Sequence, residues 1–338
     1  MRVRLAPFVR LEARRALWRA TLPTLVLGAI AAWTPESADP SAGAARYRIW
    51  QIGLLVLLPL AIGLAADRMT RIRRGEGEWL SSRPVAPLAV ISASWLGTWL
   101  AACAALVLLV VLTTTATTER KVPVLIRQGV NAHMIRIPAG ATEQVQLAGY
   151  EQGTSVRVRV GPILGGDSPT TTCAVSVTRG GTTATHEERL VARTWVEAPI
   201  PGGDDVPVLT ITNTGVGDLA WMDGTSIELY GVDGLASAVS MDLALRAAML
   251  LAAALALAAG LGAWVTTGSA TGVVLCLLLM TTQSPAFDVF GLSAAFESAA
   301  QERLPRDLGV PPYAITLALT LLGLALGRLG WHGKRVDA

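Results

Sequence analysis

The chain has 338 residues, of which 52% are hydrophobic and only 16% are charged, and its formal net charge is +3. Soluble globular proteins carry about 25% charged residues, so this composition excludes an ordinary soluble protein and indicates that lipid covers much of the surface. The small net charge gives no support for nucleic-acid binding. The cysteines and histidines are scattered, so we expect neither a disulfide in the polar middle of the chain nor a metal site; they are Cys103, Cys173, Cys276, His133, His186 and His332.

The chain begins with a basic segment, residues 1–16, whose apolar and basic positions fall on opposite faces of a helix. Glu12 intrudes on the apolar face, so the pattern is imperfect. We expect an amphipathic helix that lies in the membrane interface. A plain arginine-rich topology signal and a cleaved signal peptide over 1–35 are the alternatives. The residues expected to anchor the helix are Leu5, Phe8, Val9, Arg10 and Arg14.

Apolar segments follow that are long enough, or nearly long enough, to cross a membrane, which takes about 20 mainly apolar residues. The segment 17–33 is interrupted by Arg19, and the segment 269–284 is short. The sequence therefore predicts a polytopic α-helical membrane protein with about six transmembrane helices. The predicted spans are 17–33, 49–66, 88–113, 241–264, 269–284 and 311–330.

Arginine placement predicts the orientation of these spans, because short cytoplasmic loops are rich in Lys and Arg. Six arginines lie in 1–19 and five in the loop 67–87, whereas 34–48 carries two arginines beside two acids. We therefore expect both termini and the loop 67–87 to be cytoplasmic in a protein of the inner (plasma) membrane. Residues 114–236 would lie outside the cytoplasm, between a first membrane part, 17–113, and a second, 237–338.

The segment 114–236 has the pattern of an all-β domain. Short runs of alternating or β-branched residues, such as VRVRV at 156–160 and CAVSV at 173–177, are separated by Gly, Pro, Asp and Asn. This favours an antiparallel sandwich, and the order of its parts is similar to jelly-roll modules that bind carbohydrate. Trp195 lies in an alternating strand and is expected in the core. Trp221 is also expected in the core; of the aromatic residues it is the better candidate for ligand contact, which is the alternative.

The loop 67–87 carries the clearest functional signal. Its segment RRGEGEWLSSRPVAP combines basic residues, two glutamates, a Trp-Leu pair and two prolines, which suits docking into a groove on a cytoplasmic partner. A basic loop that only fixes topology is the alternative, but it would not explain Gly-Glu-Gly-Glu-Trp-Leu. The residues expected to contact the partner are Arg73, Arg74, Gly75, Glu76, Glu78, Trp79, Leu80, Arg83 and Pro84.

This loop resembles the cytoplasmic loop of ABC-2-type transporter permease subunits, G-[ST]-x-[DE]-x-L-L-[SA]-x-P-[VI]-[ST], which follows basic residues and leads into the third span. The chain departs from the pattern at Glu76, Ser81 and Ala86. The resemblance covers roughly 1–113 and 241–331, and the insert after the third span departs from compact family members. The matching positions are Gly75, Glu78, Leu80, Ser82, Pro84 and Val85.

The resemblance implies an exporter permease whose loop contacts a separate ATPase, together with a second permease copy or a homologue. The chain has no G-x-x-x-x-G-K-[ST] motif, so ATP and Mg²⁺ would bind the partner, and this chain would bind no cofactor and not be an enzyme itself. A membrane-anchored binding or assembly protein that displays the β-domain without transport is the alternative. An integral-membrane enzyme is a further one, although no catalytic constellation is visible.

Two features of the second membrane part complete the predictions. Asp242 and Arg246 are spaced i, i+4 at the start of the fourth span and are expected to pair on one face. The amphipathic segment 285–310 is expected either to dip into the membrane as a gate or to form a plain outer loop.

Overall fold

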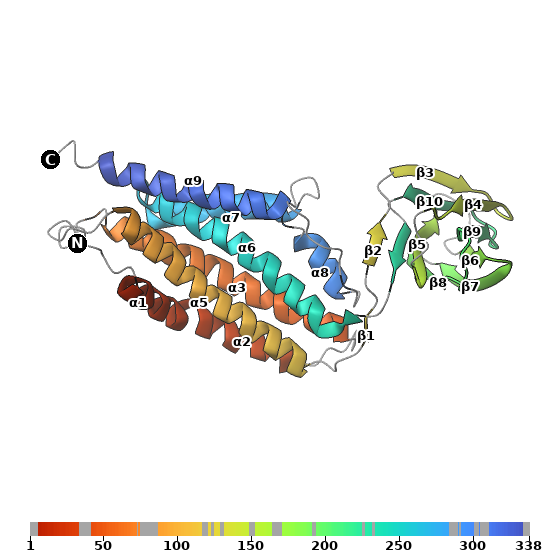
Figure 1. Cartoon of the computed structure of the whole chain (residues 1–338), viewed down its shortest axis with the longest axis horizontal. Helices are drawn as coiled ribbons and strands as arrows, with labels where there is room; N and C mark the ends of the chain where they lie inside the picture. The colour runs from red at the N-terminus through yellow and green to blue at the C-terminus, as the bar shows by residue number, and fades with distance from the viewer. Residues whose placement is uncertain are drawn as a thin grey trace. The chain divides into compact units, whose positions relative to one another are not determined.

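The computed structural model divides into two compact units, Met1–Arg120 with Leu235–Ala338, and Lys121–Gly234. The first unit is helical and the second is built of strands (Figure 1). The described residues are 6–33, 42–72, 74, 87–116, 121–122, 125–128, 132–148, 153–163, 171–190, 194–224, 227–231, 234–283, 290, 292–300, 304 and 311–333.

The helical unit begins with three consecutive helical segments: α1 (Ala6–Ala16), the π-helical turn η1 (Leu17–Thr21) and α2 (Leu22–Trp33). Proline has no backbone N–H, so Pro23 cannot donate to the carbonyl four residues earlier. The helical turn just before it contains one extra residue, so the N–H of Leu22 donates to the carbonyl of Leu17, five residues earlier. A π-turn of this kind interrupts the regular helix without breaking it.

Four described helices are long and apolar enough to cross a membrane: Ala45–Arg71, Leu88–Ala116, Ala236–Gly262 and Pro312–Trp331. They belong to α3 (Ala42–Arg71), α5 (Pro87–Ala116), α6 (Ala236–Gly262) and α9 (Pro311–Gly333). The structure thus fits a membrane protein with a β-domain, but it supports four spans where the sequence predicted about six.

The two remaining predicted spans correspond to shorter helices. The segment 17–33 divides into η1 and the 12-residue α2, which rises only about 18 Å. The segment 269–284 lies mostly in α7 (Thr267–Gln283), whose 17 residues rise about 25 Å against a hydrocarbon core of about 30 Å. A helix of nine residues, α8 (Leu292–Ala300), packs against α3 and α6.

The central helix of the unit is α6, which packs against α3, α5 and α9 (Figure 1). Small residues let the backbones approach: a Cβ on Gly260 would lie 2.3 Å from the carbonyl oxygen of Gly323, and a Cβ on Gly262 would lie 2.5 Å from that of Ala66. Association of helices in lipid depends on such close packing, because burial from water no longer drives it.

Two tryptophans one turn apart add polar contacts between α5 and α6. The indole N–H of Trp95 donates to the carbonyl of Ala252 at 2.9 Å, and that of Trp99 donates to the carbonyl of Ala248 at 3.0 Å. The two rings stack with centroids 6.2 Å apart. Hydrogen bonds between helices of this kind hold membrane segments in a defined register.

The second unit contains two antiparallel sheets, as predicted. One has the order β2-β11-β5-β10-β3, with β8 also paired to β5, and the other has the order β4-β9-β6-β7. A separate pair is formed by β1 and β12. The strands are β1 (Lys121–Val122), β2 (Leu125–Gln128), β3 (Ala132–Ile137), β4 (Thr142–Gln146), β5 (Ser155–Pro162), β6 (Thr171–Arg179), β7 (Thr182–Leu190), β8 (Thr194–Pro199), β9 (Val208–Asn213), β10 (Leu219–Gly224), β11 (Ile227–Tyr230) and β12 (Gly234–Leu235).

Alternation along the strands builds one shared core. Every second residue of β6 is buried, and its side chains join those of β5 and β9 in a single apolar cluster. The turn between β6 and β7 consists of Gly180 and Gly181, both with positive φ, at 55° and 79°. Glycine adopts that conformation without strain and fits the tight turns of antiparallel hairpins.

The structure confirms the core position expected for Trp221 and contradicts the one expected for Trp195. Trp221 is 0% exposed within the core, so it offers no surface to a ligand. Trp195 is half-buried on the opposite face of its strand, where the guanidinium of Arg159 lies 5.8 Å from its ring centroid. The prediction that Trp195 is the core residue was wrong, because Val196 and Ala198 hold the inward positions of β8.

Cys173 provides a test of this core. Burial, followed by the nearby charges of Glu188 and Glu187, raises the pKa of the thiol from 9.0 to about 12. Between these two pH values only the unfolded chain loses the thiol proton. The contribution of Cys173 to stability is therefore fully present below pH 9 and is lost as the pH rises toward 12. In a variant with Cys103 and Cys276 replaced by alanine, we expect maleimide at pH 8 to label Cys173 only after denaturation. Rapid labelling of the folded protein would contradict this packing.

Candidate functional site

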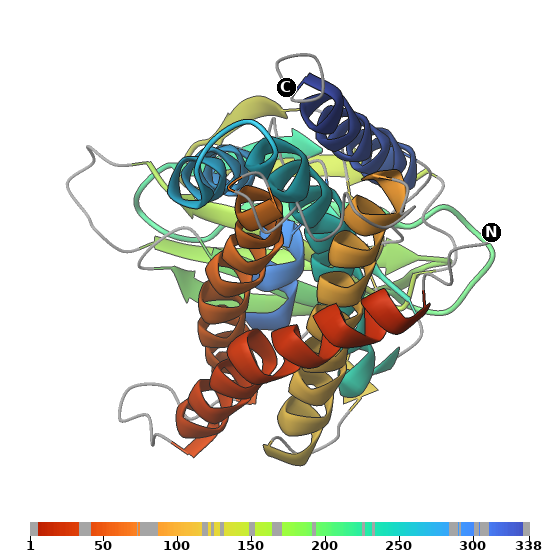
Figure 2. The same ribbon diagram turned by 90° about the vertical axis from the view of Figure 1, so that its left-hand side faces the viewer.

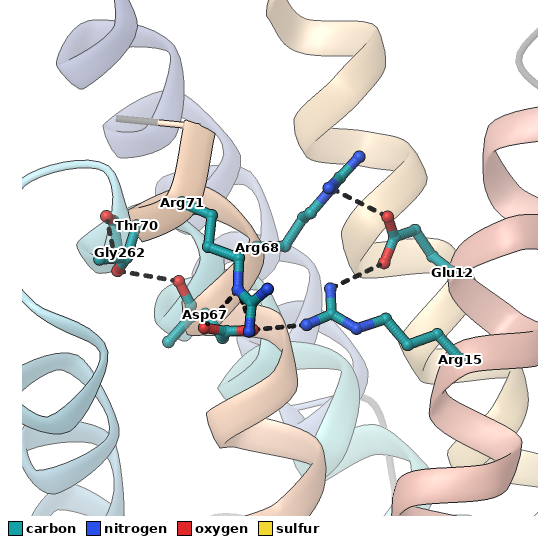
Figure 3. A network of polar contacts seen from close by, with 8 residues as sticks. Glu12, Arg15, Asp67, Arg68, Thr70, Arg71 and Gly262 are labelled. Atoms are coloured by element: carbon teal, nitrogen blue, oxygen red, sulfur yellow. Dashed lines mark hydrogen bonds and ion pairs between the residues drawn. The ribbon is translucent and has the colours of Figure 1, made fainter. Parts of the chain in front are cut away.

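A polar network connects α1 with the last turn of α3 (Figure 3). The carboxylate of Asp67 accepts a hydrogen bond from Nη2 of Arg15 at 2.5 Å and one from Nε of Arg71 at 3.0 Å. The first contact joins residues 52 positions apart, whereas Arg71 lies one helical turn beyond Asp67 on α3. Asp67 therefore joins two helices and carries two cations.

Glu12 forms the second carboxylate of the network. It is 7% exposed, and its Oε1 lies 2.9 Å from Nε of Arg68 while its Oε2 lies 3.7 Å from Nη1 of Arg15. A buried carboxylate needs such partners, since its desolvation otherwise costs several kcal/mol. The glutamate that looked misplaced on the apolar face of the N-terminal helix is therefore the side chain that binds α3.

The backbone of α1 approaches α5 closely at Gly97. A Cβ at this position would lie 2.8 Å from the carbonyl oxygen of Val9, 2.8 Å from Cβ of Glu12 and 3.0 Å from the amide nitrogen of Ala13. The missing side chain thus makes room for α1. Figure 2 views the bundle from this end and shows α1 lying across α3 and α5.

Thr70 holds the opposite side of the same turn of α3. Its hydroxyl lies 3.1 Å from the carbonyl oxygen of Ala66, 3.3 Å from that of Gly262 and 3.4 Å from that of Val265. The latter two belong to the end of α6 and the connection to α7. The last turn of α3 is thereby fixed on one side by α1 and on the other by α6.

Valine at position 70 is expected to lower the stability of the protein by about 1 kcal/mol, because it removes the hydroxyl proton that these carbonyls share. The thermal midpoint in detergent measures the change. Thr115→Val is the matched control, since that hydroxyl is exposed and bonds only to carbonyls of its own helix. Equal shifts in the two variants would contradict a contact between α3 and α6 through Thr70.

The predicted loop 67–87 begins within α3, which ends at Arg71, so the network lies directly before the residues predicted to contact a partner. Arg74 is described and exposed. The other predicted contact residues lie outside the described part of the chain: Arg73, Gly75, Glu76, Glu78, Trp79, Leu80, Arg83 and Pro84. The network itself was not predicted, although Glu12 on an apolar helix face and Asp67 at the end of an apolar span were visible signals.

The structure shows which residues of the predicted interfacial anchor pack on protein and which are exposed. Val9 and Phe8 lie on the face that turns toward the bundle and are half-buried, whereas Arg10 and Arg14 are exposed. Leu5 lies outside the described residues. The apolar face of α1 therefore packs on protein, since Gly97 lets the helix approach α5, and the basic face is turned outward.

At the other end of α6, Asp242 and Arg246 form an ion pair with Nε and Oδ2 2.6 Å apart. Nη1 of Arg246 also donates to the carbonyl of Phe290 at 3.4 Å. The nearby α8 lies within the predicted gate segment 285–310, and its Phe296 packs edge-on against Tyr47, with ring centroids 5.7 Å apart. Phe296 thus connects α8 with α3, Arg246 connects α6 with the residue Phe290 just before α8, and α8 also packs against α6.

No family model matches the chain, and no curated protein matches it either. Among the described residues, no three His, Cys, Asp or Glu side chains group in a way that would hold a metal ion. The network of Glu12, Arg15, Asp67, Arg68 and Arg71 is thus the candidate site that the structure offers. Its charged side chains hold the ends of α1 and α3 together.

Proposed function

We propose that the chain is the membrane-spanning permease subunit of an ATP-driven exporter of the ABC-2 type, coupled to a separate ATPase subunit. The observation that supports this best is the junction at the end of α3. Arg15 and Glu12 tie this turn to α1, and Thr70 ties it to α6. A loop that follows such a junction can move three helix ends together.

In this mechanism the loop 67–87 receives the movement of the ATPase. A force on the part of this loop that follows α3 acts first on Arg71 and Asp67, because they lie in the last turn of that helix. The ion pairs pass the displacement to α1, and the hydroxyl of Thr70 passes it to the α6–α7 connection. Charged contacts suit this role since they hold a defined geometry, and the partly buried pairs between α1 and α3 cost more to separate than the exposed pair within α3.

The proposal includes a topology of six spans. Two of these spans would be short. One would be formed by η1 together with α2 and the other by the 17-residue α7, and local thinning of the bilayer would accommodate their length. Both termini and the loop 67–87 would be cytoplasmic in the inner (plasma) membrane. The β-domain, a jelly-roll-like sandwich, would lie outside the cytoplasm.

The partners follow from the same proposal. ATP and Mg²⁺ would bind the ATPase subunit, since this sequence contains no phosphate-binding G-x-x-x-x-G-K-[ST] loop. A second permease copy or a homologue would complete a shared path through the membrane. This chain would form part of the path through the membrane and would contact the ATPase subunit, and it would catalyse no reaction itself.

Purification from native membranes in mild detergent tests the proposal. We expect a subunit with a phosphate-binding loop to co-purify in stoichiometric amount and to be lost when Glu78 and Leu80 are both replaced by lysine. Glu187→Lys, an exposed change in the β-domain, is the control and should retain the subunit. Absence of any ATPase, with proteins bound to the β-domain instead, would replace the transporter by a membrane-anchored assembly protein.

A further inference from the structure

The outward face of α1 and η1 carries exposed arginines and exposed apolar side chains together. Arg10 and Arg14 lie one turn apart and are exposed. Beside them, Leu11 is 59% exposed, Leu17 is 41% exposed and Trp18 is 67% exposed. On a helix with 100° per residue, the two arginines lie near the middle of this face, with Leu17 on one side and Leu11 and Trp18 on the other.

The acids of this region are already engaged elsewhere. Asp67 pairs with Arg15 and Arg71, and Glu12 pairs with Arg68 and Arg15. Within the described part of the chain, no ion-pair partner is found for Arg10 or Arg14. The outward face is therefore positively charged and attracts anions from outside the chain.

The exposed apolar side chains on this face indicate which kind of anion binds there. An exposed leucine and tryptophan beside an arginine gain free energy when they enter the acyl boundary of a bilayer, while the guanidinium remains at the level of the headgroups. Arginine also binds phosphate through two parallel hydrogen bonds. A soluble acidic protein would satisfy the charges, but it would leave the apolar side chains unexplained.

We propose that the outward face of α1 and η1, centred on Arg10 and Arg14 and flanked by Leu11, Leu17 and Trp18, binds the headgroups of anionic phospholipids. The inference goes beyond the proposed transport function and does not depend on it. In this arrangement α1 is bound on two sides. Glu12 and Arg15 bind α3, and Arg10 and Arg14 bind the membrane surface. The lipid composition then sets the position of the element that braces the end of α3.

Native mass spectrometry of the full chain in a neutral detergent tests the proposal. The probes are phosphatidylglycerol and phosphatidylcholine with the same acyl chains. We expect the protein to retain phosphatidylglycerol preferentially. One arginine near an anionic surface contributes roughly a fivefold factor in affinity, so R10Q/R14Q should weaken phosphatidylglycerol binding on the order of 25-fold without changing phosphatidylcholine binding. Both side chains are exposed, so the substitution leaves the fold intact.

Three control experiments distinguish lipid binding at this site from nonspecific attraction between arginines and anionic lipid. R159Q/R189Q removes the same charge from exposed positions in the β-domain and should leave lipid binding unchanged. R10K/R14K keeps the charge and should retain most of the preference. Excess inorganic phosphate should not displace the lipid. Equal losses in the two glutamine variants, equal retention of both lipids, or displacement by phosphate would each overturn the proposal.

Discussion

Leucine at position 323 is expected to prevent α9 from packing on α6 and so to remove most of the folded protein from the membrane. A Cβ at this position would lie 2.3 Å from the carbonyl carbon of Ala256 and 2.4 Å from its oxygen. These are backbone atoms, so no side-chain rotation relieves the clash, and the helices must separate. Overpacking in a core costs about 1–3 kcal/mol, and a backbone clash is expected at or above the top of that range.

The control for this variant lies on α7. Gly272 is also a glycine in an apolar helix, but it is exposed and nothing lies within 4 Å of a Cβ built there. Gly272→Leu should therefore leave the yield and thermal midpoint of the detergent-purified protein unchanged. If both leucine variants fold as well as the original chain, α9 does not pack on α6 in the described way.

Asparagine at position 67 is expected to weaken the junction between α1 and α3 and, under the proposed function, to reduce export driven by ATP hydrolysis. The substitution removes the charge that Arg15 and Arg71 share. Breaking a largely buried ion pair costs about 3–5 kcal/mol. Since the side chain of Asp67 is 24% exposed and that of Arg15 is 20% exposed, solvent screens part of this, and we expect about 1–3 kcal/mol.

A double-mutant cycle separates the pair from its surroundings. If Arg15→Gln and Asp67→Asn remove the same contact, the double variant should be little less stable than either single one, with an interaction energy between about 0.5 and 3 kcal/mol. Asp204→Asn, an exposed loop change in the β-domain, is the control. Strict additivity of the two single effects would show that Arg15 and Asp67 do not interact in the membrane-embedded protein.

The local parts of the fold followed from the sequence because they depend on periodicity. A run of apolar residues without charges specifies a membrane helix, and alternation in VRVRV and CAVSV specifies strands with one inward face. The Gly180-Gly181 turn was recognisable since only such residues adopt positive φ readily. The length of the first predicted span did not follow in this way, because the π-turn Leu17–Thr21 interrupts its regular helix.

Which face of an element is buried was decided only by its neighbours. Trp195 and Trp221 both stand in strands and were both expected in the core, but only Trp221 is fully buried there. Inward and outward positions differ by one residue in register, so the pattern around Trp195 did not settle which face it takes. The same holds for α1, whose apolar face is covered by α5 at Gly97 and whose basic face is turned outward. Amphipathicity identifies two faces, but it does not say whether protein or lipid covers the apolar one.

From the sequence alone came the membrane character of the chain, the inserted β-domain and the loop that motivates the proposed coupling to an ATPase. Only the tertiary structure brought Glu12 and Arg15 to Asp67 and Arg68, residues more than 50 positions apart, and so revealed the junction before that loop. Periodicity and composition are properties of neighbouring residues, whereas an ion pair between helices depends on where the whole chain packs them.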